Sequence, residues 1–295
     1  MTQDETPNES AHSYNFREMK EHTVHISDDI AFRISSDTKP SKWKTTDLQK
    51  GLRLIYHGTE AVGEGTGFGV PVLQYSSDLY FSGKSRLLVS HGDEMLAIRK
   101  EFLMDMVPTR TIRNSRIQSI FLLGFWRSLN QLYMKHRLWR FIIQMSISRR
   151  IGIRTRFAKV KPAGTVILTY IVKNNRIRVT ADLRFVDKRN LQSVFLLNEQ
   201  SSDLLRRYYD SNGVKLHDCQ IGAWDTVKAT RAVMTNANGG VGFRVSQVAG
   251  ATLRRGREYL KGYQDWAGLD YAFIPNGRVT FEYDIETLKN DGRKR

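Results

Sequence analysis

Acidic and aromatic side chains alternate in a short stretch near the end of the chain. Glu258, Asp265 and Asp270 occur there, with Trp266 and Tyr271 each following one of the aspartates. Flat aromatic rings suit the C–H faces of a sugar, and carboxylates bind its hydroxyl groups or move its protons. Two carboxylates at a set separation also suit glycosidic chemistry. We therefore take the three acids as candidate acid/base or hydroxyl-binding groups and the two aromatic residues as candidate stacking platforms.

A structural interpretation of the same stretch stays open. Glu258 would then pair with a neighbouring arginine, and Trp266 and Tyr271 would pack in the core. A further candidate lies upstream, where the apolar run that ends at Leu197 is followed by Asn198, Glu199 and Gln200. Polar residues directly after an apolar strand are typical of the rim of a site, so Glu199 joins the candidate ligands, although many strands simply end this way.

Basic residues concentrate in the middle of the chain. The protein carries a net charge of +16, and residues 110–159 contain twelve Lys and Arg but no Asp or Glu. Such a stretch attracts polyanions such as nucleic acid, unless acids from elsewhere in the fold pair with it. Trp126 or Trp139 would stack on bases. The candidate phosphate contacts are Arg113, Arg116, Arg127, Lys135, Arg137, Arg140, Arg149 and Arg150.

Other motifs exclude several kinds of site. A dinucleotide-binding fingerprint needs G-x-G-x-x-G, but the sixth residue from Gly63 is Phe68 and the sixth from Gly65 is Val70. No P-loop closes this glycine run, which favours a bulged or twisted strand crossing. The seven histidines are scattered, and the single cysteine, Cys219, allows no disulfide within the chain. The sequence therefore predicts neither a metal nor a nucleotide cofactor.

The local patterns predict many strands and one helical insert. Residues 165–172 form an apolar run, residues 173–176 favour a hairpin turn, and residues 177–185 alternate apolar and polar side chains. Apolar residues spaced by three, four and seven positions predict an amphipathic helix over 115–147. Short strands at this spacing are typical of an antiparallel sandwich or barrel.

We therefore predict a mainly β fold, a large antiparallel sandwich with the helical insert. Residues 1–40 carry eight acids and four bases and are predicted to be largely disordered. Residues 41–288 are predicted to form one domain, and residues 289–295 a frayed basic tail. The outline of a large sheet with one inserted helix, and with carboxylates beside aromatic residues, resembles the galactose-mutarotase-like supersandwich. That resemblance is one of architecture and implies the fold rather than a reaction.

Three functions remain open on these residues. The first is a sugar-binding or sugar-acting sandwich, the second a polyanion-binding protein, and the third a structural or interaction module without catalysis. The N-terminal residues lack the basic and apolar regions of a secretory signal, and the longest central apolar run, residues 120–126, is far shorter than a membrane span. The expectation is a cytoplasmic protein with no transmembrane segment and an undecided oligomeric state.

Overall fold

The computed structural model describes residues 14–37, 48–63, 65–76, 78–92, 95–111, 154–222, 224–260 and 264–289. The predicted amphipathic helix at 115–147 lies outside these residues. So do all eight basic residues assigned to polyanion binding, and the predicted tail beyond residue 289. The helix, the polyanion-binding residues and the frayed tail therefore remain predictions from the sequence.

The described residues form a β-sandwich whose first layer is long and antiparallel. Its strands follow the order β14-β13-β16-β17-β20-β11-β10-β8-β7, and β1 and β9 pair at its side with β7 and β8. The bounds are β1 (Arg17–Met19), β7 (Asp78–His91), β8 (Leu96–Thr111), β9 (Arg154–Lys159), β10 (Thr165–Lys173), β11 (Arg176–Asp182), β13 (Arg207–Asp210), β14 (Lys215–His217), β16 (Arg231–Thr235), β17 (Val241–Ser246) and β20 (Thr280–Lys289).

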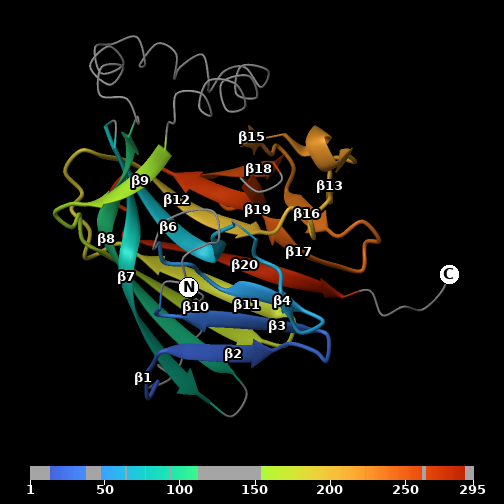
Figure 1. The fold of residues 1–295 in the computed structure, drawn as a ribbon, viewed down its shortest axis with the longest axis horizontal. Coiled ribbons are helices and arrows are strands. Elements are labelled where there is room, and N and C mark those ends of the chain that lie inside the picture. Colours follow the sequence, from blue (N-terminus) through green and yellow to red (C-terminus); the bar gives the residue numbers. More distant parts are fainter. Residues whose placement is uncertain are drawn as a thin grey trace, which may run out of the picture.

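The second layer continues from β7 in the order β6-β12-β19-β18-β15. A short 3-10 helix, η2 (Asp218–Ile221), precedes β15. Figure 1 shows β12, β19 and β18 in this layer, with β11 and β20 in the other. The bounds are β6 (Gly67–Tyr75), β12 (Leu191–Gln200), β15 (Asp225–Thr226), β18 (Ala251–Leu260) and β19 (Gln264–Phe273).

The core lies between the two layers and is rich in aromatic rings. Phe68 of β6 meets Phe243 of β17 edge to face, with ring centroids 4.8 Å apart. The rings of Tyr271 of β19 and Tyr283 of β20 lie 4.7 Å apart with an interplanar angle of 54°, across the sandwich. Every second side chain along these strands points into the core, where the side chains of the two layers pack against one another. The predicted β-sandwich is confirmed.

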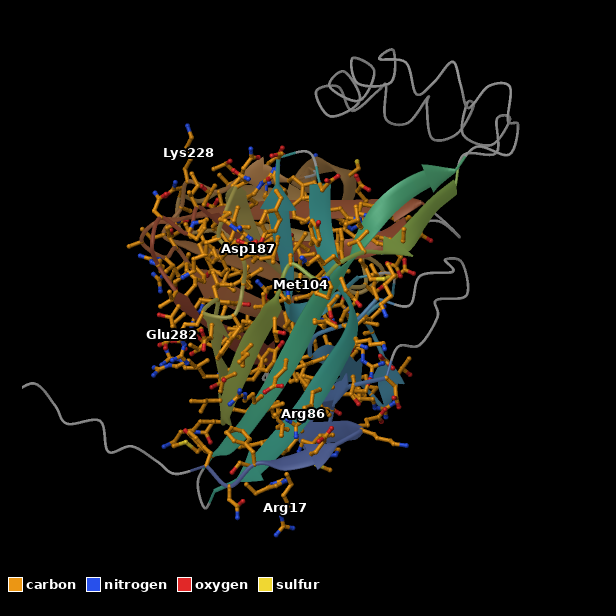
Figure 2. The ribbon with its side chains drawn as sticks, turned by 90° about the vertical axis from the view of Figure 1, so that its left-hand side faces the viewer. Arg17, Arg86, Met104, Asp187, Lys228 and Glu282 are labelled. Atoms are coloured by element: carbon orange, nitrogen blue, oxygen red, sulfur yellow. The ribbon has the colours of Figure 1, made fainter. Side chains whose placement is uncertain are left out.

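Two features of the N-terminal region differ from expectation. Residues 17–19 form β1, which pairs with β7. In Figure 2, Arg17 of β1 and Arg86 of β7 lie near the same end of the molecule, and Lys228 lies near the other. A second sheet joins β2 (Glu21–His25), β3 (Ile30–Ser35), β4 (Arg53–Tyr56) and β5 (Thr59–Glu60). These residues were expected to be largely disordered, but the structure has strands here: β1 pairs with the distant β7, β2 and β3 pair as a local hairpin, and β3 pairs with β4. Phe32, for example, packs on Phe68 at 5.6 Å.

A buried lysine joins this small sheet to the first layer. The Nζ atom of Lys100, on β8, donates hydrogen bonds of 2.6 Å to the carbonyl oxygens of Ser35 and Lys50. Burial, together with the nearby charge of Arg53, holds the pKa of Lys100 well below its ordinary value. The side chain thus contributes two hydrogen bonds at a position that disfavours its charge.

Lys100 is expected to give stability a distinctive pH dependence. Between its lowered folded pKa and the ordinary value of 10.5, the unfolded chain binds more protons than the native protein, so stability rises with pH. Compared with Lys100→Met, the wild-type free energy of unfolding should gain up to about 1.4 kcal/mol per pH unit within that interval. Urea unfolding of both proteins from pH 7 to pH 10 measures the difference, and parallel pH profiles would contradict the assignment.

The remaining sequence-based expectations concern the limits and surroundings of the domain. Among the described residues, no helix has the length and apolar character needed to cross a membrane. The domain limits at residues 41 and 288, the cytoplasmic location and the oligomeric state stay predictions.

Candidate functional site

The second layer carries a set of polar and aromatic residues on the side turned away from the core. Leu253, Leu269 and Tyr271 point into the core, so alternation turns Arg254 and Asp270 to the other side. Arg254 lies opposite Asp270 in the β18–β19 ladder. We call this side the outer face, defined by Glu199, Trp224, Arg254, Glu258, Trp266 and Asp270.

Two carboxyl groups, from β12 and β19, lie on the outer face next to a bulge in β6. The register between β12 and β6 shifts between Leu197 and Asn198, where Gly69 is the extra residue of β6, and the pairing of β12 with β19 is interrupted at the same two residues of β12. That N–H donates a hydrogen bond of 2.6 Å to Oδ1 of Asp270. Glu199 follows directly and, by alternation, points to the outer face. Glu199 therefore lies on the same face as Asp270 of the neighbouring strand β19.

The side chain of Asn198 fixes this bulge from the core side. Its Oδ1 accepts hydrogen bonds from the backbone N–H of Gly69 at 3.0 Å and from the hydroxyl of Tyr283 at 2.8 Å. Its Nδ2 donates to the carbonyl oxygen of Leu269 at 3.0 Å. One amide thus connects β6, β12, β19 and β20, and it positions the residues on either side of it.

The glycine run ends within this network. Gly69 has a φ of +75° and faces Tyr170, whose hydroxyl lies 2.9 Å from where a β-carbon would stand. The Tyr170 hydroxyl donates to the carbonyl oxygens of Phe68 and Gly69. At the other end of the run, the N–H of Thr66 donates to Oε2 of Glu199 at 3.2 Å. The run is thus the start of a distorted strand, as its residue types indicated, and it also supports a site carboxylate.

The environment of Asp270 favours its protonated form. Asp270 is fully buried, and burial raises its pKa well above the ordinary value of 3.8. The Glu199 carboxylate raises the pKa of Asp270 further, while the hydrogen bond from Asn198 and the charge of Arg254 oppose this. The Oδ2 atom of Asp270 has no hydrogen-bond partner among the described residues. Asp270 is therefore suited to hold a proton, with a second carboxylate beside it.

Two tryptophans form an apolar wall on the outer face. The rings of Trp224 and Trp266 lie 5.0 Å apart with an interplanar angle of 33°. Gly256 makes room for them, because a β-carbon there would stand 2.7 Å from the Trp266 ring. Trp224 has a φ of +64°, a conformation that costs a bulky residue about 1–3 kcal/mol. Such backbone strain is characteristic of functional positions and directs attention to Trp224, which the sequence did not single out.

The six residues predicted from the sequence as sugar-site candidates do not all lie on one face. Glu199, Glu258, Trp266 and Asp270 lie on the outer face, with Glu258 directly opposite Trp266 in the ladder. Tyr271 points into the core, where its hydroxyl donates to the carbonyl oxygen of Ser246.

Asp265 also lies off the outer face. Its carboxylate accepts hydrogen bonds from the hydroxyls of Ser201 and Ser202 and from the backbone N–H of Ser202. These bonds hold the turn that follows β12. Asp265 therefore supports the neighbouring loop, and neither it nor Tyr271 faces the tryptophan pair.

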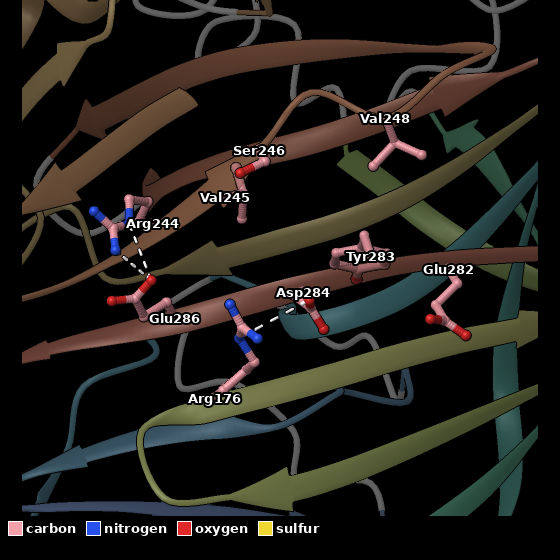
Figure 3. Close-up of a pocket in the computed structure, with 9 residues that line it drawn as sticks. All are labelled: Arg176, Arg244, Val245, Ser246, Val248, Glu282, Tyr283, Asp284 and Glu286. Carbon is pink, nitrogen blue, oxygen red and sulfur yellow. Dashed lines mark hydrogen bonds and ion pairs between the residues drawn. The ribbon is translucent and has the colours of Figure 1, made fainter. Parts of the chain in front are cut away.

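A separate pocket of about 260 Å³ opens where β17 and β20 part (Figure 3). Its charged residues pair with one another or with neighbours: Arg176 lies 3.9 Å from Asp284, Arg244 pairs with Glu286, and Glu282 lies 3.4 Å from Arg178. Such mutual pairing is typical of a solvated sheet surface. Among the residues that the structure describes, no three His, Cys, Asp or Glu side chains are grouped to hold a metal ion.

Comparisons with known proteins show likeness in fold alone. No protein-family model matches the chain, and no curated protein sequence matches it. An α-N-acetylgalactosaminidase from Bifidobacterium bifidum, solved as a Gal-NHAc-DNJ complex, shares 8% identity at a TM-score of 0.50. The match covers 92% of this chain but only 36% of that enzyme.

A second solved structure is a protein from Escherichia coli K12 named as a candidate aldose 1-epimerase. It shares 11% identity at a TM-score of 0.40, and the match covers 92% of this chain and 100% of that protein. The chain thus shares a β-sandwich fold with part of the larger Bifidobacterium enzyme, and its own function must be argued from its own residues.

Proposed function

We propose that the protein binds a carbohydrate on the outer face of the second layer and transfers protons at the anomeric centre of the sugar. The observation that carries this proposal is the pair formed by Asp270 and Glu199. Two carboxyl groups share one face, and burial favours the protonated form of Asp270. Pairs of carboxyl groups whose environments separate their pKa values serve as acid and base in enzymes.

The chemistry of such a pair is simple for a cyclic aldose. Glu199, as a carboxylate, accepts the proton of the hydroxyl group on C1. Asp270, as a carboxylic acid, donates its proton to the ring oxygen, and the bond between C1 and the ring oxygen breaks to give the open-chain aldehyde. Ring closure on the opposite face of C1 returns both protons and gives the other anomer. No metal or redox partner enters this balance.

The other residues of the outer face suit the rest of a sugar. Trp224 and Trp266 form an apolar wall for its C–H groups. Glu258 is partly exposed beside Trp266 and is placed to accept hydrogen bonds from hydroxyl groups. Arg254 and Trp224 are also partly exposed, whereas Asp270 and Glu199 are buried. A sugar would therefore first meet the exposed rim and then reach the carboxyl groups beneath it.

The expected result is faster exchange between sugar anomers in the presence of the protein. Exchange NMR on D-glucose, D-galactose and N-acetyl-D-galactosamine measures it, and Glu199→Gln should slow the catalysed exchange by at least about 100-fold. Glu282→Gln is the matched control, because Glu282 is an exposed carboxylate on the first layer. If no sugar in the panel binds and none exchanges faster, the proposal fails.

Polyanion binding stays a prediction for the basic residues between 110 and 159. Retention of the full chain on heparin, with steep dependence on salt, tests it independently of the outer face.

A further inference from the structure

Arg254 occupies an unusual position on the outer face. It lies on β18 directly opposite Asp270, and it is partly exposed at the rim. Its Nε and Nη2 atoms donate hydrogen bonds of 3.2 and 3.1 Å to the carbonyl oxygen of Trp224. The guanidinium carbon also lies 5.5 Å from the centre of the Trp224 ring. These contacts fix the guanidinium group in one place beside the tryptophan pair.

This cation has no counterion of its own within the described part of the chain. Neighbouring arginines form ion pairs: Arg255 lies 3.6 Å from Asp225, and Arg257 lies 3.3 Å from Asp218, which also pairs with Arg206. Among the described residues, no carboxylate forms an ion pair with Arg254 within 4.0 Å, and its hydrogen bonds come from Nε and Nη2. The one carboxyl group opposite it, Asp270, favours its neutral form. A partly desolvated guanidinium group therefore stands with donors free beside the acid pair.

We propose that Arg254 binds an anionic group on the exocyclic carbon of the sugar, either the carboxylate of a hexuronic acid or the phosphate of a hexose 6-phosphate. This inference rests on the proposed function. A guanidinium group carries five N–H donors in a planar fork that matches the oxygens of a carboxylate or phosphate. With Nε and one Nη2 hydrogen directed to Trp224, the edge formed by Nη1 and Nη2 remains for a bidentate contact.

The order of the strands matches the order of groups on a pyranose ring. Glu199 lies on β12, Asp270 on the adjacent β19, and Arg254 on β18 beyond it. In a pyranose, the ring oxygen lies between C1 and C5, and C5 carries the exocyclic carbon. A sugar whose C1 hydroxyl faces Glu199 and whose ring oxygen faces Asp270 therefore directs its exocyclic group toward Arg254.

The same order keeps the anionic group away from the Glu199 carboxylate. Neighbouring strands lie about 4.8 Å apart, so β12 and β18 are separated by about 10 Å across β19. At that distance repulsion by Glu199 is weak compared with a direct contact to the guanidinium group. Asp225, the other acid close to Arg254, pairs with Arg255.

The test compares matched neutral and anionic sugars by isothermal titration calorimetry on the full chain. The probes are D-glucose and D-galactose, their hexuronates, and their 6-phosphates. The wild-type protein should bind at least one anionic series about tenfold or more tightly than its neutral counterpart, as a charged hydrogen-bonded pair does. Arg254→Met and Arg254→Gln should both remove this preference. Gln keeps one N–H donor for the Trp224 carbonyl, so it separates loss of charge from loss of folding.

Each outcome has a distinct meaning. Preference for both hexuronates alone identifies a carboxylate, and preference for both 6-phosphates alone identifies a phosphate. Arg178→Met, on the first layer, should leave the preference unchanged. Equal binding of neutral and anionic sugars overturns the role of Arg254 but leaves the proposed function standing, whereas absence of all binding overturns both.

Discussion

Replacing Asn198 by alanine is expected to lower the free energy of unfolding by about 3–6 kcal/mol, because three buried partners lose their hydrogen bonds at once. Those partners are the N–H of Gly69, the hydroxyl of Tyr283 and the carbonyl oxygen of Leu269. Each of these groups lies in the core region, where water does not replace the lost bond. The segment of β12 that carries Glu199, and the β6 bulge at Gly69 opposite it, would lose their support as well.

Urea unfolding at pH 7 measures the loss. Asn212→Ala is a suitable control, because Asn212 lies exposed in a turn, and a change within about 0.5 kcal/mol is expected there. A loss below about 1 kcal/mol for Asn198→Ala would show that the network does not hold the two layers together in solution.

Replacing Asp270 by asparagine is expected to maintain or raise the free energy of unfolding, unlike Asn198→Ala, and to slow catalysed anomer exchange strongly. Asparagine keeps an oxygen that accepts the N–H of Asn198, but it has no proton to give. Catalysed anomer exchange should therefore fall by at least about 100-fold. At pH 7 the free energy of unfolding should equal or exceed that of the wild type, because the variant no longer buries a carboxyl group that resists ionisation.

The pH dependence of that gain follows from the raised pKa of Asp270. Between the ordinary value of 3.8 and the higher folded value, the native protein binds more protons than the unfolded chain, so its stability falls as pH rises. The advantage of Asp270→Asn should accordingly grow with pH within that interval, by up to about 1.4 kcal/mol per unit. Urea unfolding at pH 4 and pH 8 tests this. A variant with wild-type exchange activity would remove Asp270 from the reaction.

Asp270→Ala separates the two roles of this side chain. Alanine removes both the proton and the oxygen that accepts the Asn198 N–H, so we expect a loss of stability of about 1–3 kcal/mol. Loss of activity in both variants, with opposite changes in stability, would show that activity depends on the carboxyl group and not on the rigidity of the bulge.

Local patterns in the sequence predicted much of the β-sandwich. The apolar run at 165–172 and the alternating residues from 177 onward became β10 and β11, joined by the turn at 174–175. These elements pair with their neighbours in the chain, so short-range pattern and long-range structure agree. The strands between residues 17 and 35 were not predicted, because β1 depends on its distant partner β7 and the hairpin of β2 and β3 alternates apolar and polar residues only weakly.

The candidate site was predicted in part, and strand alternation explains the rest. Asp265 and Asp270 are five positions apart on one strand, and Tyr271 directly follows Asp270. Successive side chains on a strand point to opposite faces, so these three residues could not all share a face with Trp266. The candidate residues were chosen by their type, and the stretch was not predicted to form one continuous strand. Glu258, Trp266 and Asp270 have the same parity across the β18–β19 ladder and do lie together.

Trp224 and Arg254 were not predicted as site residues from the sequence, for different reasons. The position of the Trp224 side chain depends on a backbone conformation with positive φ, which residues other than glycine rarely adopt. Arg254 stands in a strand with several other arginines, and only the ion pairs seen in the structure show that Arg255 and Arg257 are neutralised. Composition alone does not separate a paired arginine from an unpaired one.

The position of the sugar is the central claim, and indole NMR tests it most directly. The chain has five tryptophans, whose N–H signals can be assigned by single Trp→Phe variants. Titration with the sugars of the panel should shift the signals of Trp224 and Trp266 together, in proportion to binding, and leave the other three unchanged. If a sugar binds and shifts only the other tryptophans, or if no indole signal responds to any sugar, the outer face is not the binding site.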